Sequence, residues 1–405
     1  MDKYNHILKR FFFVAVSIYA ILVAIYILKI PAGRGDEALF VSDLNLIHNK
    51  GWIDAITKNI SIPFMILVYP LSFILKKHIA LRLISLFLTI ALFFYFEKRY
   101  KFSTTFYFYL VFYLSTTIFF FYGTNDTLFN VSLIVFFSEV FLLYQYKKFD
   151  SSIAFVALII AFFTRALLIV YLPVVLIGLF IIYKCRKSFT LKLRYPIAVL
   201  IIMLVINIPS LKENGVLSYD LKSPPKSIDA TWGQRQYLAQ LLINKGELKK
   251  GSHPTWAETQ EYINVNGVES LPISISDAIF FDLKLTFKEF FKDFGNTLFL
   301  GFRQLGLILA LIIIIPLAKL LKQRKLEYNY FLPASFLIMI AAFSFIIISN
   351  VELRWLAPIF VMAIVWYTYQ EEIKLLNNKI VFLNYIVLLA LVSYGGFRMF
   401  EKLMV

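Results

Sequence analysis

The chain has 405 residues, of which 60% are hydrophobic and only 16% are charged, whereas a soluble domain is about half apolar and about a quarter charged. The formal net charge is +16, but the lysines and arginines stand at the ends of apolar runs, a pattern that argues against nucleic acid as a partner. Cys185 is the only cysteine, which excludes an internal disulfide and a cysteine metal site.

The apolar residues come in runs about as long as the roughly 20 residues that a helix needs to cross a bilayer. The sequence therefore predicts an all-α polytopic membrane protein with about 11 transmembrane helices, interfacial helices and one large outer loop. The first run follows Lys9 and Arg10 and is interpreted as a retained anchor instead of a cleaved signal. The predicted spans are 11–28, 79–96, 102–121, 127–146, 152–164, 166–183, 195–211, 296–320, 328–349, 356–370 and 380–397.

The run 60–75 is ambiguous, because it is apolar but contains Pro63 and Pro70. If it does not span, most basic clusters fall on one side, as short cytoplasmic loops require. We therefore expect a multi-pass protein of the cell membrane with a cytoplasmic N-terminus, and with 60–75 in the interface or re-entering. The run 152–183 is predicted to be a hairpin that turns near Arg165 at the outer face.

Residues 212–295 form the one long polar insertion. Within it, 255–264 is predicted to be a short helix that stops at Asn266 and Gly267. The segment 276–294 carries phenylalanines on one stripe and charges on the other, which is typical of a helix that lies flat on a membrane; packing on the loop's own small core is the alternative. The predicted organisation is an N-terminal transmembrane module (1–211) with an outer juxtamembrane segment (29–78), an extracytoplasmic loop (212–295) and a C-terminal transmembrane module (296–405).

Several ionisable groups fall at the outer ends of these spans. Charged groups at membrane depth are costly, and their common side makes them candidates for a functional site. Carboxylates beside arginines suit proton transfer on a substrate with a phosphate leaving group, because a guanidinium binds phosphate oxygens bidentately. The candidates are Asp36 with Glu37, Asp126, Arg165, and Glu352 with Arg354.

Asp36 is the preferred general base, because it follows Gly33-Arg34-Gly35, where the backbone can approach a ligand closely. Glu37 would support Asp36 or bind the acceptor. Glu139 lies inside a predicted span without an evident partner, and a structural hydrogen bond is the favoured role. His48, His78 and His253 are scattered, and their spacing does not support a metal site.

Five short motifs resemble landmarks of the C-type glycosyltransferase superfamily, in particular the bacterial group that is similar to protein O-mannosyltransferases and to lipid A aminoarabinose transferases. They occur in the same order along nearly the whole chain. The motifs are Gly35-Asp36-Glu37-Ala38-Leu39-Phe40; Ile62-Pro63 with Leu81-Arg82-Leu83; Asn125-Asp126-Thr127; Ala161-Phe162-Phe163-Thr164-Arg165-Ala166 with Tyr171-Leu172-Pro173; and Glu352-Leu353-Arg354-Trp355-Leu356-Ala357-Pro358.

This resemblance implies an outward-facing site in which a sugar passes from a polyprenyl-phosphate donor to a glycan, lipid or protein acceptor of the cell envelope. By motif, Asp36 would be the base, Asp126 a second acidic group, and Arg354 a phosphate contact, with Arg165 as a further phosphate candidate. Neither a metal nor another cofactor is implied. Trp355 stands where the family usually has tyrosine, and the acceptor stays open.

Two other functions fit a chain with many spans and one long outer loop. A polysaccharide polymerase is one, although it leaves the acidic pair after the first span unexplained. A transporter or flippase of lipid-linked sugars is the other, although we see no internal repeat of the kind that marks many transporters. Clustering of Asp36, Asp126 and Arg354 at one place would favour the glycosyltransferase.

Overall fold

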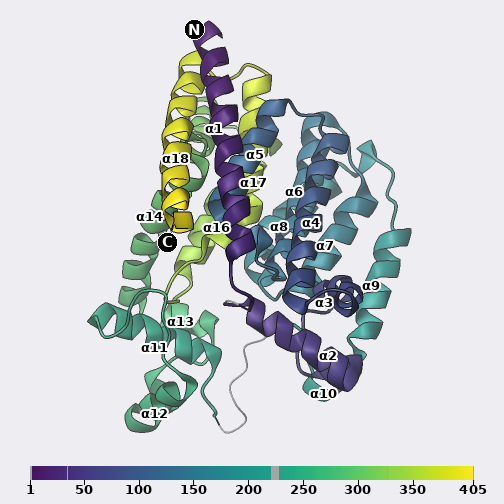
Figure 1. Ribbon diagram of the computed structural model, residues 1–405, viewed down its shortest axis with the longest axis vertical. Coiled ribbons are helices and arrows are strands. Elements are labelled where there is room, and N and C mark those ends of the chain that lie inside the picture. The colour runs from purple at the N-terminus through teal and green to yellow at the C-terminus, as the bar shows by residue number, and fades with distance from the viewer. Residues whose placement is uncertain (1, 34, 220–227, 326, 405) are drawn as a thin grey trace. The chain divides into compact units, whose positions relative to one another are not determined.

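The computed structural model describes residues 2–33, 35–219, 228–325 and 327–404, with the side chains of Asp2 and Lys3 excepted (Figure 1). Helices and turns make up these described parts, and no strand occurs in them. The chain divides into two units. The first comprises Met1–Asp220, Gly301–Phe336 and Arg354–Val405, and the second comprises Leu221–Leu300 and Leu337–Leu353.

The helices of the first unit follow most of the predicted spans. They are α1 (Asp2–Lys29), α2 (Glu37–Thr57), α3 (Ile62–Val68), α4 (Lys77–Arg99), α5 (Thr104–Thr117), α6 (Asp126–Tyr146), α7 (Ser151–Thr164), α8 (Leu168–Lys184), α9 (Arg194–Ile206), α10 (Ile208–Asn214), α15 (Leu307–Gln323), α17 (Ala357–Glu372) and α18 (Asn378–Met404). A further helix, α16 (Phe331–Phe345), runs from the first unit into the second.

Five helical segments of the described chain are long and apolar enough to cross a membrane, or up to seven if each bent helix pair is one span. The five are Tyr4–Lys29, Lys77–Arg99, Asp126–Tyr146, Tyr328–Phe345 and Asn378–Met404. The chain is thus a helical protein compatible with a membrane, and the larger number of 11 spans stays a prediction.

The core of the first unit is built around α6, which contacts α4, α7, α8 and α17. In α6, 94% of the most apolar window is buried, against 22% in α1 and 28% in α18. A helix that is apolar on all sides is stable only when other helices surround it. The exposed apolar sides of α1 and α18 are compatible with contact to lipid.

Glu139 lies in the middle of this buried helix and is fully inaccessible to solvent. Its carboxylate accepts two hydrogen bonds from Arg99, at 2.8 and 2.6 Å, and a third from the Tyr95 hydroxyl at 2.8 Å. The Asp150 backbone N–H donates a fourth, at 2.8 Å. The expected structural role is confirmed: the ion pair with Arg99 joins α4 to α6, and the hydrogen bond from Asp150 ties α6 to the start of α7.

Three predicted spans are wrong as continuous helices. The span 102–121 ends at Thr117, where Ile118 adopts a left-handed conformation and turns the chain towards the loop before α6. The span 195–211 bends by 46° between α9 and α10, where Pro209 lies in the first turn of the second helix. The span 296–320 is broken at Gly306, where α14 (Leu283–Leu305) and α15 meet at 115°.

Glycine explains the last break. Gly306 has φ +61°, which side chains rarely adopt, and a Cβ there would lie 2.9 Å from Leu388 of α18.

The ambiguous run 60–75 does not form a long helix. It folds into the seven-residue α3 and the five-residue 3₁₀ helix η1 (Tyr69–Phe73). Seven α-helical and five 3₁₀ residues together rise about 20 Å, which is short of the roughly 30 Å hydrocarbon core. The predicted break at Arg165 is also confirmed, because α7 ends at Thr164 and α8 begins at Leu168.

The second unit contains α11 (Trp232–Lys245), α12 (Trp256–Asn266), α13 (Ile275–Phe281) and most of α14. The predicted short helix is confirmed in α12: Thr255 and Glu258 form a capping box, and Gly267 ends the helix. The single predicted helix 276–294 is wrong, because α13 and α14 are separate. Asp282 interrupts it with an extended backbone, and its carboxylate accepts from the Leu285 N–H at 3.0 Å.

Helix α14 buries three of its polar side chains and exposes two of its phenylalanines. Thr286, Glu289 and Asp293 are buried, whereas Phe287 and Phe291 are 52% and 69% exposed. Glu289 is satisfied by a hydrogen bond from Asn244 at 2.9 Å. Phe290 and Phe294 are half-buried, and the Phe290 ring lies 4.2 Å from the Phe345 ring. The exposed pair fits the predicted interfacial position and the half-buried pair fits the alternative of packing within the unit, so the interfacial position stays a prediction.

Candidate functional site

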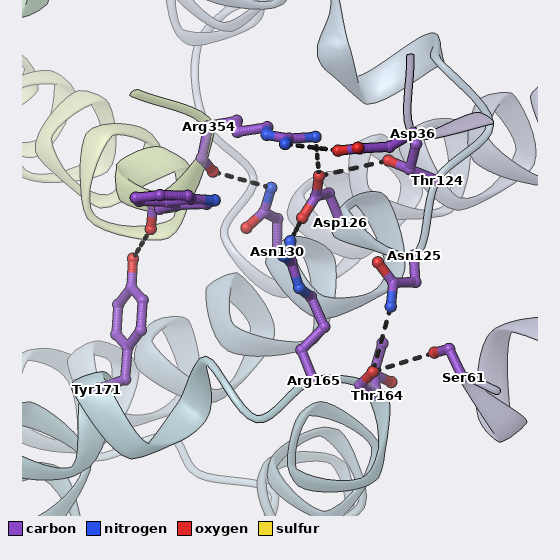
Figure 2. A network of polar contacts seen from close by, with 11 residues as sticks. Asp36, Ser61, Thr124, Asn125, Asp126, Asn130, Thr164, Arg165, Tyr171 and Arg354 are labelled. Atoms are coloured by element: carbon purple, nitrogen blue, oxygen red, sulfur yellow. Dashed lines mark hydrogen bonds and ion pairs between the residues drawn. The ribbon is translucent and has the colours of Figure 1, made fainter. Parts of the chain in front are cut away.

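Three segments far apart in the sequence bring oppositely charged side chains together (Figure 2). Asp36 stands directly before α2, Asp126 is the first residue of α6, and Arg354 lies in the 3₁₀ helix η6 (Leu353–Leu356). The Arg354 Nη2 donates to Asp36 Oδ2 over 2.6 Å, and its Nη1 donates to Asp126 Oδ2 over 2.8 Å. One guanidinium therefore bridges two carboxylates.

Asp126 in turn bridges two guanidiniums. Its Oδ2 binds Arg354, and its Oδ1 forms an ion pair with Arg165, which lies between α7 and α8. The result is an alternating row, Asp36 to Arg354 to Asp126 to Arg165, which we call the ion-pair network. Two negative and two positive charges balance within it.

The members of the ion-pair network differ in exposure. The side chain of Asp126 is 3% exposed, against 29% for Asp36, 17% for Arg354 and 21% for Arg165. Asp126 is therefore the buried anchor that holds both guanidiniums. The three other side chains are the groups that a ligand can reach.

Polar side chains around the network fix the backbone segments that carry it. Asn125 Nδ2 and Ser61 Oγ both donate to the Thr164 carbonyl, at 3.3 and 3.0 Å, and so tie the start of α6 and of α3 to the end of α7. Asn130 Nδ2 donates to the Arg354 carbonyl at 3.4 Å. The Tyr171 hydroxyl donates to the Trp355 carbonyl, which anchors the same turn from α8 (Figure 2).

Glu37 lies beside the network but pairs elsewhere. It is 2% exposed and accepts two hydrogen bonds from Arg82, at 2.6 and 2.8 Å, and one from the Gly33 N–H at 2.7 Å. Arg82 also donates to the carbonyls of Ile30 and Pro31, both at 2.9 Å. Of its two expected roles, this burial favours support of Asp36 over contact with an acceptor.

Arg82 is a residue whose role sequence reasoning missed. It lies inside the predicted span 79–96, and a charge within a span is the same signal that drew attention to Glu139. The partner could not be foreseen, because Glu37 is 45 positions away. Together, Glu37 and Arg82 close the turn between α1 and α2 and thereby fix Asp36.

Gly123 links this pair to the loop that carries Asp126. It has φ +69°, and a Cβ there would lie 2.9 Å from Leu81 Cβ and 3.2 Å from Glu37 Oε1. Only glycine fits this position, because any side chain would strain the backbone and push the loop off the Glu37 and Arg82 pair.

The remaining candidates lie outside the ion-pair network. Glu352 belongs to the second unit, and Arg34 lies outside the described residues. His48 contacts Ser72 at 2.9 Å, and burial and the nearby Lys77 lower its pKa. Within the described parts of the chain, no group of three or more histidine, cysteine or acidic side chains could hold a metal ion.

The geometry supports two kinds of chemistry. A partly exposed carboxylate can accept a proton from a hydroxyl or an amine. Two partly exposed guanidiniums that are both bound to one buried carboxylate can also bind the oxygens of an anion such as a phosphate. No protein-family model, no curated protein and no solved structure matches this chain.

Proposed function

We propose that this protein is a membrane glycosyltransferase of the C-type superfamily. It would move a sugar from a polyprenyl-phosphate donor to an acceptor of the cell envelope at the outer face of the cell membrane. The ion-pair network carries the proposal. Asp36, Asp126 and Arg354 are the three residues that the resemblance assigns to the site by motif. Arg354 contacts both carboxylates, although 318 positions separate it from Asp36.

The donor binds through its phosphodiester, which contacts Arg354 and Arg165. An anion that binds Arg354 competes with the two carboxylates that this guanidinium holds. Asp36 is the more exposed of the two carboxylates, whereas Asp126 is buried and contacts both arginines. The phosphate therefore displaces Asp36, which becomes available as a base.

The chemical step needs one base and one stabilised leaving group. Asp36 takes the proton of the acceptor hydroxyl or amine while the acceptor atom bonds to the anomeric carbon of the sugar. The bond from that carbon to the phosphate oxygen breaks, and its electron pair stays on the polyprenyl phosphate, where the guanidiniums stabilise the added charge. Attack from the face opposite the phosphate inverts the anomeric configuration.

The clustering of Asp36, Asp126 and Arg354 is what distinguishes this proposal from the two alternatives. A polysaccharide polymerase leaves the acidic pair after the first span without a role. A transporter of lipid-linked sugars needs no base beside its phosphate contacts. In the proposed transfer, the partly exposed carboxylate accepts the proton of the acceptor. The guanidinium beside it binds the phosphate that leaves the sugar.

The test is transfer in proteoliposomes that contain the purified chain, an envelope lipid and glycan extract, and one of several hexosyl or pentosyl polyprenyl phosphates. We expect one donor to be consumed, with release of polyprenyl phosphate measured by mass spectrometry. Intact donor that has merely crossed the bilayer would identify a transporter, and growth of a polymer on a lipid diphosphate would identify a polymerase. Failure to consume any donor, with folding shown by thermal unfolding, would contradict the proposal.

A further inference from the structure

A second polar site lies at the opposite end of α1 from the ion-pair network. There, a cavity of about 680 Å³ is bordered by the first turns of α1, the end of α17 and the start of α18. Figure 1 shows α1 and α18 side by side, and a hydrogen bond of 3.3 Å from Asn5 Nδ2 to the Asn378 carbonyl joins their first turns. A volume of several hundred Å³ is that of a small-molecule site, and it is larger than a single inorganic ion needs.

Two ammonium groups give the lining of this cavity an excess of positive charge. Lys9, on α1, is half-buried, and Lys374, in the turn after α17, is exposed. Among the described residues that line the cavity, Glu371 is the one acid. Two lysines against one carboxylate leave one positive charge, so the cavity attracts an anion.

The carboxylate of Glu371 has a fixed position beside the two lysines. Its oxygens accept hydrogen bonds from the hydroxyls of Tyr109 and Tyr385, at 2.9 and 3.2 Å. Both tyrosines are 1% exposed, so they hold this carboxylate from inside the helix bundle. A carboxylate oxygen can accept more than one hydrogen bond, and Glu371 can therefore also accept from a hydroxyl group of a ligand.

Asn377 adds an uncharged donor to the lining. Its Oδ1 accepts a hydrogen bond of 2.9 Å from the Lys379 N–H at the start of α18. The group that Asn377 can offer to a ligand is then its amide N–H₂. The lining thus combines ammonium and amide donors, which suit anionic oxygens, with a carboxylate acceptor, which suits hydroxyl groups.

We infer that this cavity binds a small water-soluble organic anion that also carries hydroxyl groups, such as a sugar phosphate. The anionic group contacts Lys9 and Lys374, and a hydroxyl group donates to Glu371. An anion without hydroxyl groups meets the negative charge of Glu371 without this compensation, and an uncharged sugar does not use the lysines. The site is independent of the proposed transfer reaction, because it shares no residue with the ion-pair network.

The test titrates glucose 6-phosphate and glycerol 3-phosphate into the purified full chain in a non-ionic detergent, by isothermal titration calorimetry. Inorganic phosphate and glucose are the parallel titrations. We expect saturable binding of at least one hydroxylated phosphate, at least about 10-fold tighter than binding of inorganic phosphate or glucose. Binding of neither hydroxylated phosphate would overturn the site, and equal binding of inorganic phosphate would overturn the assignment of the ligand.

Two double variants with the same change of charge test the position of the site. Lys9→Gln with Lys374→Gln should weaken binding at least about 10-fold, because the anion loses its charge-assisted hydrogen bonds. The matched control is Lys322→Gln with Lys325→Gln, two exposed lysines that do not line the cavity, and it should bind like the unmodified chain. Equal losses in both would show general charge attraction and overturn the site. Lys374→Gln alone, at an exposed turn, keeps the test decisive if the first double variant does not fold.

Glu371→Gln tests the contact with the hydroxyl groups. This variant removes the negative charge beside the lysines, so inorganic phosphate should bind more tightly than it does to the unmodified chain. The preference for the hydroxylated phosphate should then fall. A preference that stays the same in Glu371→Gln would contradict the role of this carboxylate.

Discussion

Asp36 and Asp126 are both acidic residues at helix starts, but they differ in burial and therefore in the roles proposed for them. Asp126 offers one oxygen to each arginine and is nearly inaccessible, whereas Asp36 is 29% exposed and contacts Arg354 from the outside. From the sequence, both were candidates for the site, and Asp36 was preferred because of its neighbouring glycines. The structure gives Asp36 the greater exposure, and in the proposed reaction the more exposed carboxylate releases its guanidinium to the donor phosphate.

This difference predicts separate effects on stability. Asp126→Asn leaves two partly buried guanidiniums without their shared counter-charge and should cost about 3 to 5 kcal/mol of folding free energy. Asp36→Asn should cost much less, because its pair is more exposed. The measurement is thermal unfolding in detergent, with Asp54→Asn, an exposed carboxylate of α2, as control. An Asp126→Asn protein as stable as the control would mean that Asp126 is not the anchor.

Pairs across long distances in the sequence are what sequence reasoning could not supply. Glu139 and Arg82 were visible as charges inside predicted spans, but their partners, Arg99 and Glu37, lie 40 and 45 positions away. Without the packing of α2, α4 and α6 there is no reason to choose these partners over others. The type of residue at a helix end was therefore predictable, whereas the contacts that make it structural or reactive were not.

At the scale of elements, the loop 123–126 connects the support of Asp36 to the anchor Asp126. Gly123→Ala should displace this loop, because the added Cβ would meet Leu81 Cβ at 2.9 Å as well as strain the backbone. We expect a loss of stability beyond the roughly 1 to 2 kcal/mol of a left-handed alanine, together with loss of transfer.

Gly215→Ala is the matched control for this substitution. Gly215 has φ +68° against +69° for Gly123, but nothing lies within 4 Å of its Cβ position. Thermal unfolding and transfer of the two variants should be compared. If both variants lose stability equally and both keep activity, transfer does not depend on the contact between the loop and the Glu37 and Arg82 pair.

Helix α14 matches its predicted amphipathic pattern in part, through the exposed Phe287 and Phe291, and does not match its predicted bounds. The spacing of the phenylalanines predicted the stripe. The ends of the helix, however, are set by Asp282, which caps its start, and by the left-handed Gly306, which follows its last residue. Such breaks depend on local hydrogen bonds and on close packing with another helix. Average hydropathy over a window does not detect them.

The exposed phenylalanines predict where α14 lies. In a Cys185→Ser background, a fluorescent probe at Phe291→Cys should be quenched by lipid-borne quenchers in liposomes, because this position is 69% exposed on an apolar stripe. A probe at Lys288→Cys, an exposed charged position, should respond to water-soluble quenchers instead. Equal quenching of both probes by the aqueous quencher would place α14 away from the membrane.

The exposed phenylalanines also predict a contact with the lipid part of the donor, so Phe287→Ser with Phe291→Ser should raise the donor concentration needed for half-maximal transfer. The fold should survive, because both side chains are exposed. Unchanged donor dependence would leave α14 with a structural role alone.

At the scale of the whole molecule, the topology rests on the distribution of basic residues. A reporter inserted after Lys148 should lie in the cytoplasm, and one inserted at Gly251 should lie outside, because Ile62–Phe73 is too short to add a crossing. Accessibility to a membrane-impermeant reagent in intact cells measures this directly. Labelling of the first position and protection of the second would invert the proposed topology and move the ion-pair network to the cytoplasmic side.

The central claim is that Asp36 removes a proton while the neighbouring guanidiniums bind the donor phosphate. The most direct measurement is the rate of sugar transfer by Asp36→Asn in proteoliposomes, beside the unmodified chain and the control Asp54→Asn. Loss of a general base costs about 100-fold to 10,000-fold in rate, so Asp36→Asn should lose at least about 100-fold in turnover while the control keeps its rate and donor binding survives. Transfer by Asp36→Asn at a rate near that of the control would contradict the account.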